Sequence, residues 1–196
     1  MEESRLPNSQ PWSVRRAELI DVPAVARLLG APVPAEWRSG TGLSDQALTS
    51  ATRLILTHVA LEHGEFWVAV DPSGPVRAAV VLLPPGHRSG QIMDVALRLE
   101  LGLLPAARPE PVALEDVPDE HWLLLPAAGP HDEQPLRELL DAALPAIDAD
   151  GRAVLSLQPG PPPRVLFEVG FRSLPTSSLV SGSASLRPGI RRPVGV

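Results

Sequence analysis

The chain has 196 residues, 44% of them hydrophobic and 20% charged, which is the composition of one folded domain rather than of a disordered chain. It contains no Cys, no Tyr and no Lys, and these absences exclude thiolate nucleophiles, disulfides, Schiff-base lysines and tyrosine acids. The net charge is −6 and no arginine stripe occurs beyond Arg191 and Arg192, so we expect no nucleic-acid partner.

The ends of the chain are expected to lie outside the folded domain. Residues 1–11 are polar and contain prolines, so we interpret them as a flexible N-terminal arm. We assign residues 12–187 to a single domain and residues 188–196 to a C-terminal tail. The acidic start lacks an apolar core and no apolar run of about 18 residues occurs, so we expect a cytoplasmic protein with neither a signal peptide nor a membrane span.

Hydrophobic periodicity and turn residues predict a chain that alternates between strands and helices. Ser44 is a favourable N-cap and Gly64 a favourable end for one helix, and the sequence 71–74, Asp-Pro-Ser-Gly, predicts a hairpin turn. Pro145 is expected to kink a later helix. In chain order we expect a strand over 12–17, helices over 21–30 and 44–63, strands over 66–70 and 76–83, a helix over 89–104, a strand over 121–127, a helix over 132–149, a strand over 153–157, a short helix over 164–169 and a strand near 184–187.

Four stretches of this pattern carry a family resemblance. They are VRRA at 14–17 with DVP at 21–23, residues 54–64 leading into FWVAV at 66–70, HWLLL at 121–125, and AVL at 153–155 through to VGF at 169–171. Together they resemble the GNAT superfamily of acyl-CoA-dependent N-acetyltransferases, nearest to the puromycin N-acetyltransferase type. The resemblance implies a single α/β domain with a mixed, mostly antiparallel central sheet that is flanked by helices and splayed into a V.

The resemblance also implies acetyl-CoA as the acyl donor, with its pyrophosphate held at a helix N-terminus by a Gln/Arg-x-x-Gly-x-Gly/Ala turn. The matching stretch, residues 129–137, lacks those glycines. Pro135 removes one backbone donor, and Asp132 and Glu133 place negative charge where a pyrophosphate would lie, or simply stabilise the helix dipole. The remaining expected cofactor contacts are backbone groups of Ala127, Ala128, Gly129 and Leu136, and the guanidinium of Arg137 as a phosphate clamp.

The catalytic positions of the family also differ in this sequence. The tyrosine that would protonate the leaving thiolate corresponds to Leu166, while a Glu and an Asn of the puromycin-type relatives correspond to Ser156 and Pro162. Glu120 and His121, at the start of the central strand, are the best remaining acid/base pair, because a neighbouring carboxylate orients an imidazole and raises its basicity. The plainer interpretation, which we favour, is that both are exposed residues at a strand start.

Two further features bear on ligands. Trp37 lies in a loop over 31–41 that can close over an acceptor, which makes it a candidate substrate-binding residue, or it packs in the core. His58 and Glu62 are four residues apart on one helix, as two metal ligands can be, but no third ligand accompanies them. We therefore expect no metal site.

Two functions remain open at this point. One is an atypical acyl-CoA-dependent N-acyltransferase that acts on a small amine, with Glu120 or His121 as the base. The other is a catalytically inactive relative that binds a small molecule or a protein partner in the former cleft. An apolar C-terminal segment over 186–196 could join the sheet of a second copy, which would make a homodimer.

Overall fold

The computed structural model of the protein describes residues 12–30, 44–86, 117–129, 131–158, 161–174 and 187–194. The expected N-terminal arm, the helix over 89–104 and Trp37 lie outside these residues. The strands are β1 (Ser13–Arg16), β2 (Glu65–Val70), β3 (Val76–Leu83), β4 (His121–Ala128), β5 (Ala153–Gln158), β6 (Arg172–Ser173) and β7 (Arg187–Arg191). The helices are η1 (Leu19–Asp21), α1 (Val22–Gly30), α3 (Asp45–Ile55), η2 (Leu56–Ala60), α4 (Leu61–His63), α6 (Glu133–Asp150) and α7 (Arg164–Glu168).

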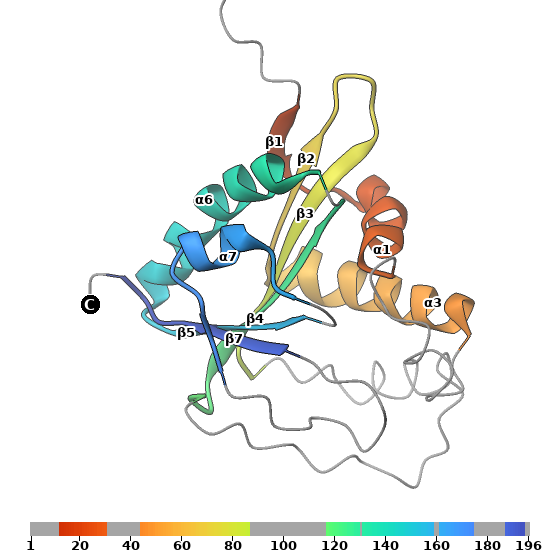
Figure 1. Ribbon diagram of the computed structural model, residues 1–196. Helices are drawn as coiled ribbons and strands as arrows, with labels where there is room; N and C mark the ends of the chain where they lie inside the picture. Colours follow the sequence, from red (N-terminus) through yellow and green to blue (C-terminus); the bar gives the residue numbers. More distant parts are fainter. Residues whose placement is uncertain are drawn as a thin grey trace, which may run out of the picture.

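The strands form one seven-stranded sheet in the order β1-β2-β3-β4-β5-β7-β6. Every neighbouring pair is antiparallel except β4 and β5, which are parallel. Parallel neighbours need a long crossover, and α6 supplies it. Figure 1 shows α1 and α3 on one side of the sheet and α6 and α7 on the other. The expected single α/β domain with a mixed, mostly antiparallel sheet is confirmed.

Alternation along the central strands creates two hydrophobic cores, one on each face of the sheet. Successive side chains of a strand point to opposite faces, so β2, β3 and β4 each contribute to both cores. On the face covered by α6 and α7 the buried strand residues are Ala69, Ala78, Val80, Leu82, Leu124 and Val154. On the face covered by α1 they are Phe66, Val68, Ala79, Val81 and Ala127.

The turn and cap residues act as the sequence indicates. In the turn between β2 and β3, Gly74 takes a φ of +106°, and the carboxylate of Asp71 accepts a hydrogen bond of 2.9 Å from the Ser73 N–H. Ser44 caps α3 by accepting from the Ala47 N–H at 3.1 Å. The helical run from α3 continues through η2, a single π-helical turn, and ends at Gly64.

The last strand differs from the sequence expectation. We expected a strand near 184–187 and a tail from residue 188, but β7 runs over Arg187–Arg191 and pairs with both β5 and β6. Pro188 and Gly189 disfavour a strand interpretation, because both weaken a ladder. What holds β7 is the buried Arg191, which pairs with Asp148 of α6, a contact across 43 residues that no local pattern indicates.

Candidate functional site

The parallel strands β4 and β5 part from one another along their length. They pair from His121 opposite Ala153 to Leu124 opposite Ser156. Beyond that level β4 continues to Ala128 and remains paired with β3, while β5 continues to Gln158 and remains paired with β7. This divergence is the V-shaped opening that the family resemblance implied. It leaves the last residues of β4, beyond Leu124, without a strand partner on the edge that faces β5.

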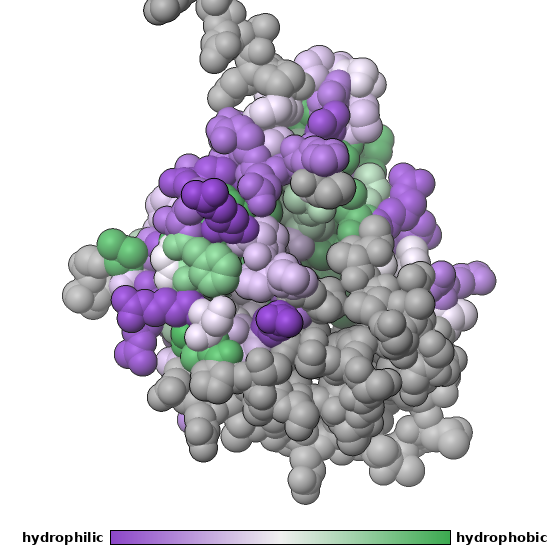
Figure 2. All heavy atoms as spheres, viewed as in Figure 1, coloured by the Kyte–Doolittle hydropathy of each residue, from purple (hydrophilic) through white to green (hydrophobic). Residues whose placement is uncertain are grey.

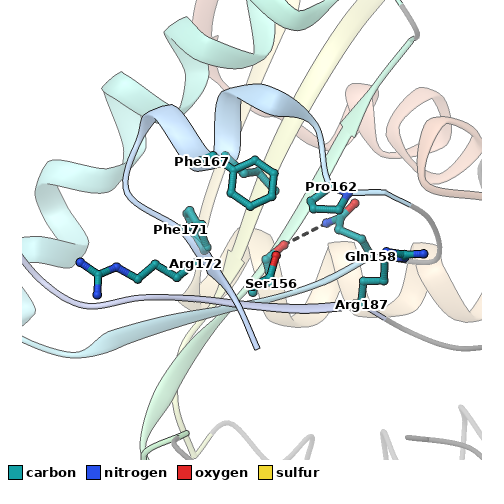
Figure 3. Close-up of a pocket in the computed structure, with 10 residues that line it drawn as sticks. Ser156, Gln158, Pro162, Phe167, Phe171, Arg172 and Arg187 are labelled. Atoms are coloured by element: carbon teal, nitrogen blue, oxygen red, sulfur yellow. Dashed lines mark hydrogen bonds between the residues drawn. The ribbon is translucent and has the colours of Figure 1, made fainter. Parts of the chain in front are cut away.

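A hollow lies beside the opening, between β5, β7 and α7 (Figure 3). It contains about 230 Å³ of space, including its open mouth. Ser156, Pro162 and Leu166, the three positions at which the family resemblance expects catalytic side chains, all line it. The sequence indicated that each of these positions is changed, and the structure adds that they converge in one place.

The hollow has a mostly apolar wall and a polar floor. Figure 3 shows Phe167 and Phe171 above Ser156, with Pro162 and Gln158 at the other side. Ser156 is 1% exposed, and its hydroxyl oxygen accepts a hydrogen bond of 2.9 Å from the Gln158 amide. Sequence reasoning missed Gln158 as a site residue, although its spacing of two from Ser156 places both side chains on the same face of β5.

The N-terminus of α6, the place expected for a pyrophosphate, is occupied by a carboxylate. Asp132 makes no cap hydrogen bond, and its Oδ1 lies 2.9 Å from Nη2 of Arg77 on β3. Its Oδ2 lies 2.6 Å from the point that a Cβ on Gly129 would occupy, so the side chain folds back over the loop. A bound diphosphate would meet this charge unless Asp132 moves. The first-turn N–H groups of Glu133 and Gln134 have no partner within the helix.

The other expected cofactor residues already contact neighbouring parts of the protein. Ala127 and Ala128 pair with β3, the Leu136 side chain is 1% exposed, and the Leu136 N–H donates to the Asp132 carbonyl at 3.1 Å. The Arg137 guanidinium bonds Asp141 at 3.2 Å and Glu168 at 3.0 Å. Their role in cofactor binding stays a prediction.

Glu120 and His121 lie at the closed end of the opening. Glu120 is 71% exposed and pairs with Arg152 at 3.2 Å, so it does not pair with His121 as a catalytic carboxylate would. Nδ1 of His121 lies 2.8 Å from the Pro118 carbonyl. A carbonyl only accepts, so this contact places the ring proton on Nδ1 and leaves the lone pair on Nε2. His121 lies on the sheet face opposite to Ser156.

A hydrogen bond between Trp122 and the carboxylate of Asp150 lies next to this closed end. Trp122 donates through Nε1 to Asp150 at 2.8 Å, and this hydrogen bond, with those from Arg152, holds the pKa of Asp150 below its ordinary value. The contact fastens the start of β4 to the end of α6. It therefore fixes the closed end of the opening, whereas at the far end β4 and β5 no longer pair with each other.

The described residues give no support to a metal site. His58 and Glu62 lie 3.6 Å apart as a pair, and no group of three or more potential ligands occurs in the part of the chain that the structure describes. Within the same part, no helix is long and apolar enough to cross a membrane.

Over nearly its whole length the chain superposes on crystal structures of acetyltransferases. An acetyltransferase from Corynebacterium glutamicum matches with a TM-score of 0.57 at 17% identity, over 95% of this chain and 99% of that one. A phosphinothricin acetyltransferase from Sinorhizobium meliloti, in complex with AcCoA, matches with a TM-score of 0.57 at 14% identity, over 95% and 90%. A GNAT N-acetyltransferase from Escherichia coli, in complex with CoA, matches with a TM-score of 0.51 at 15% identity, over 96% and 85%. No protein-family model and no curated protein matches the sequence.

The chain therefore has the GNAT acetyltransferase fold. The superpositions define the fold, and because the identities are only 14–17%, the reaction must be argued from the site.

Proposed function

We propose that the protein is an acyl-CoA-dependent N-acyltransferase that acylates a small amine. The observation that carries the proposal is the end of β4–β5 pairing at Leu124 and Ser156, beyond which β4 continues to Ala128, shortly before α6 begins at Glu133. An extended chain such as pantetheine can add to a strand edge through backbone hydrogen bonds, and the unpaired edge of β4 offers such a place. Solved structures with this fold hold AcCoA or CoA, which supports the same ligand here.

The residues at the opening supply part of the required chemistry. The thioester provides an activated acyl group, and its transfer needs a base for the amine and a hydrogen-bond donor for the leaving thiolate. The proposed base is His121, whose Nε2 carries the free lone pair. It lies at the closed end of the opening, so the amine must reach it there, directly or through a water molecule. Leu166, at the position of the family's tyrosine, has no proton to give, so this side chain supplies no acid for the leaving thiolate.

A second candidate function follows from the loop before α6. The carboxylate of Asp132, paired with Arg77, lies at the place expected for the pyrophosphate. An inactive relative that no longer binds coenzyme A would show this arrangement. We keep this candidate as the alternative, in which the opening binds another small molecule.

Calorimetry with acetyl-CoA and with free coenzyme A distinguishes the two candidates. We expect micromolar binding that weakens in Arg137→Ala and is unchanged in Arg53→Ala, an exposed arginine on α3. Thiol release in the presence of small amines then reports turnover, and the protein adds no background because it contains no Cys. Absence of binding at millimolar coenzyme A would refute the acyltransferase proposal in favour of the alternative.

A further inference from the structure

Three polar side chains meet at the mouth and floor of the hollow beside β5. Ser156 is nearly fully buried, and within the described residues its hydroxyl accepts from Gln158 but has no acceptor for its own proton. A buried hydroxyl that donates to nothing is costly, so its proton is available to an acceptor atom that enters the hollow. Gln158 has a second amide N–H beyond the one that it gives to Ser156.

A guanidinium lies beside these two donors. Arg187 of β7 stands directly opposite Gln158 of β5 in the antiparallel register, so the two side chains share a face of the sheet. Figure 3 shows both at the same end of the hollow, whereas Arg172 extends away from Ser156. Within the part of the chain that is described, the Arg187 side chain makes no ion pair or hydrogen bond. An unpaired arginine next to two further donors is a ready partner for an anion.

The local charge supports an anionic ligand as well. Residues 159–196 contain five arginines and one glutamate, a formal charge of +4 in a protein of net charge −6. The glutamate, Glu168, pairs with Arg137 and Arg164, and Arg191 is held by Asp148. Figure 2 shows hydrophobic surface over α7, next to the hydrophilic surface of α6, and Phe167 of α7 is 46% exposed. Two arginines, Arg172 and Arg187, line the hollow, its lining contains no acidic residue within the described part of the chain, and it has an apolar border.

The size of the hollow follows from one glycine. Gly189 stands opposite Ser156 in the register, so no side chain from β7 fills the space in front of the hydroxyl. A Cβ on Gly189 would lie 3.6 Å from the Arg172 carbonyl oxygen and 3.9 Å from a ring carbon of Phe171, which are ordinary contacts. Alanine is thus sterically accepted there, and its methyl group would occupy the hollow. The space in front of the hydroxyl is narrow and open to solvent, so it admits the polar end of a small molecule and leaves the rest of that molecule at the mouth.

We propose that this hollow binds the carboxylate of a small molecule, with Ser156, Gln158 and Arg187 donating hydrogen bonds and Phe167 and Phe171 covering its apolar portion. Insofar as this inference rests on the proposed acyltransferase function, the carboxylate belongs to the amine acceptor. The acceptor class is then an amino acid or a similar amino carboxylate. Polyamines without an acidic group are excluded, because the local charge repels them.

Binding of propionate to the full chain, without coenzyme A, tests the site by itself. Propionamide has nearly the same shape and no charge. We expect propionate to shift the backbone NMR signals of Ser156, Gln158 and Gly189 with a millimolar Kd, and propionamide to bind at least about tenfold more weakly, as the loss of charge-assisted hydrogen bonds implies. Equal binding of the two probes, or shifts elsewhere only, would overturn the proposal.

Three variants test whether propionate binds in the hollow. Arg187→Gln is expected to weaken propionate about tenfold through loss of the charged donor. Arg192→Gln, which removes an exposed arginine of the same segment outside the hollow, is expected to leave it unchanged. Gly189→Ala is expected to abolish binding while the thermal midpoint is retained, since its Cβ meets no close atom. Binding that survives both Arg187→Gln and Gly189→Ala refutes the site.

A transfer assay separates this inference from the proposed function. With acetyl-CoA, β-alanine is expected to be acylated at least about tenfold faster than its amide, for the same electrostatic reason. If propionate binds as expected and no amine is acylated, the carboxylate site stands and the acyltransferase proposal fails. If β-alanine and its amide are acylated equally and propionate does not bind, the acyltransferase proposal stands and the carboxylate site is refuted.

Discussion

Replacement of Arg191 by Met tests how the C-terminal strand is attached to the domain. Arg191 is 6% exposed and donates to both carboxylate oxygens of Asp148, at 2.5 and 2.7 Å, and through Nε to the Val169 carbonyl at 2.8 Å. One side chain thus joins β7 to the end of α6 and to the residue after α7. Met fills a similar volume but leaves the Asp148 carboxylate and the Val169 carbonyl without this donor.

The expected loss is about 3 kcal/mol in the free energy of unfolding, at the lower end of the range for breaking a buried ion pair, because 20% of the Asp148 side chain remains exposed. For a chain of this length that loss corresponds to a fall of about 6–12 °C in Tm. Hydrogen bonds from Arg191 hold the pKa of Asp148 below its ordinary value. In the unfolded chain the pKa of Asp148 is about 4, and above this pH the ionised carboxylate contributes its full stabilisation of the fold. This stabilisation is lost as the pH falls from there through the lower pKa of the folded state.

Urea unfolding measures the free energy of unfolding for the wild type and three variants. The variants are Arg191→Met, Arg191→Lys, and Arg191→Met combined with Asp148→Leu. We expect Lys to recover only part of the loss, since it cannot make the bidentate contact, and the double variant to recover most of it, because no unpaired charge remains. The difference between wild type and Arg191→Met is expected to shrink below pH 4, as Asp148 becomes protonated. A loss under about 1 kcal/mol at pH 7, or a difference independent of pH, would refute the reasoning.

The remaining predictions concern a cap, a close approach and the cofactor loop. Ser44→Ala is expected to cost about 1 kcal/mol in urea unfolding through loss of the α3 cap, and an unchanged stability would contradict the capping role. Gly64→Ala is expected to cost about 1–3 kcal/mol, because its Cβ would lie 2.4 Å from the Leu82 carbonyl oxygen, while Gly30→Ala, with open space around it, is expected to cost nothing measurable. Asp132→Asn is expected to raise the calorimetric affinity for coenzyme A about tenfold by removing a charge next to the diphosphate, and an unchanged affinity would place the diphosphate elsewhere.

Local signals were sufficient for much of the fold. The turn at Asp71 and Gly74 and the cap at Ser44 depend on backbone and side-chain groups a few residues apart, so their chemistry is readable from the sequence. Strand β7 was placed too early, because its stability comes from a buried arginine and a distant aspartate. Pairing over such separations leaves no periodic pattern in the chain.

The candidate site shows the same division between local and distant information. Family resemblance pointed to Ser156, Pro162 and Leu166 one at a time, and only the fold brings them to one hollow. Gln158 and Arg187 escaped notice because their significance depends on the register between β5 and β7. The ion pair between Arg77 and Asp132 was equally invisible, since the two residues are 55 positions apart.

A proline of β4 lies where the opening begins. Pro126 has no N–H and is compatible with a strand only where the ladder needs no donor, and it lies two residues beyond Leu124, the last residue of β4 that pairs with β5. On β5 the residue opposite Leu124 is Ser156. On its other side Ser156 pairs with Gly189 of β7, which has no side chain. Beyond Leu124 only the pairing of β4 with β3 continues, and the missing side chain at Gly189 leaves space beside β5. The opening proposed for the acyl donor and the hollow proposed for the carboxylate are therefore neighbours, because the pairing of β4 with β5 ends at Ser156 and the residue of β7 opposite that same serine is Gly189.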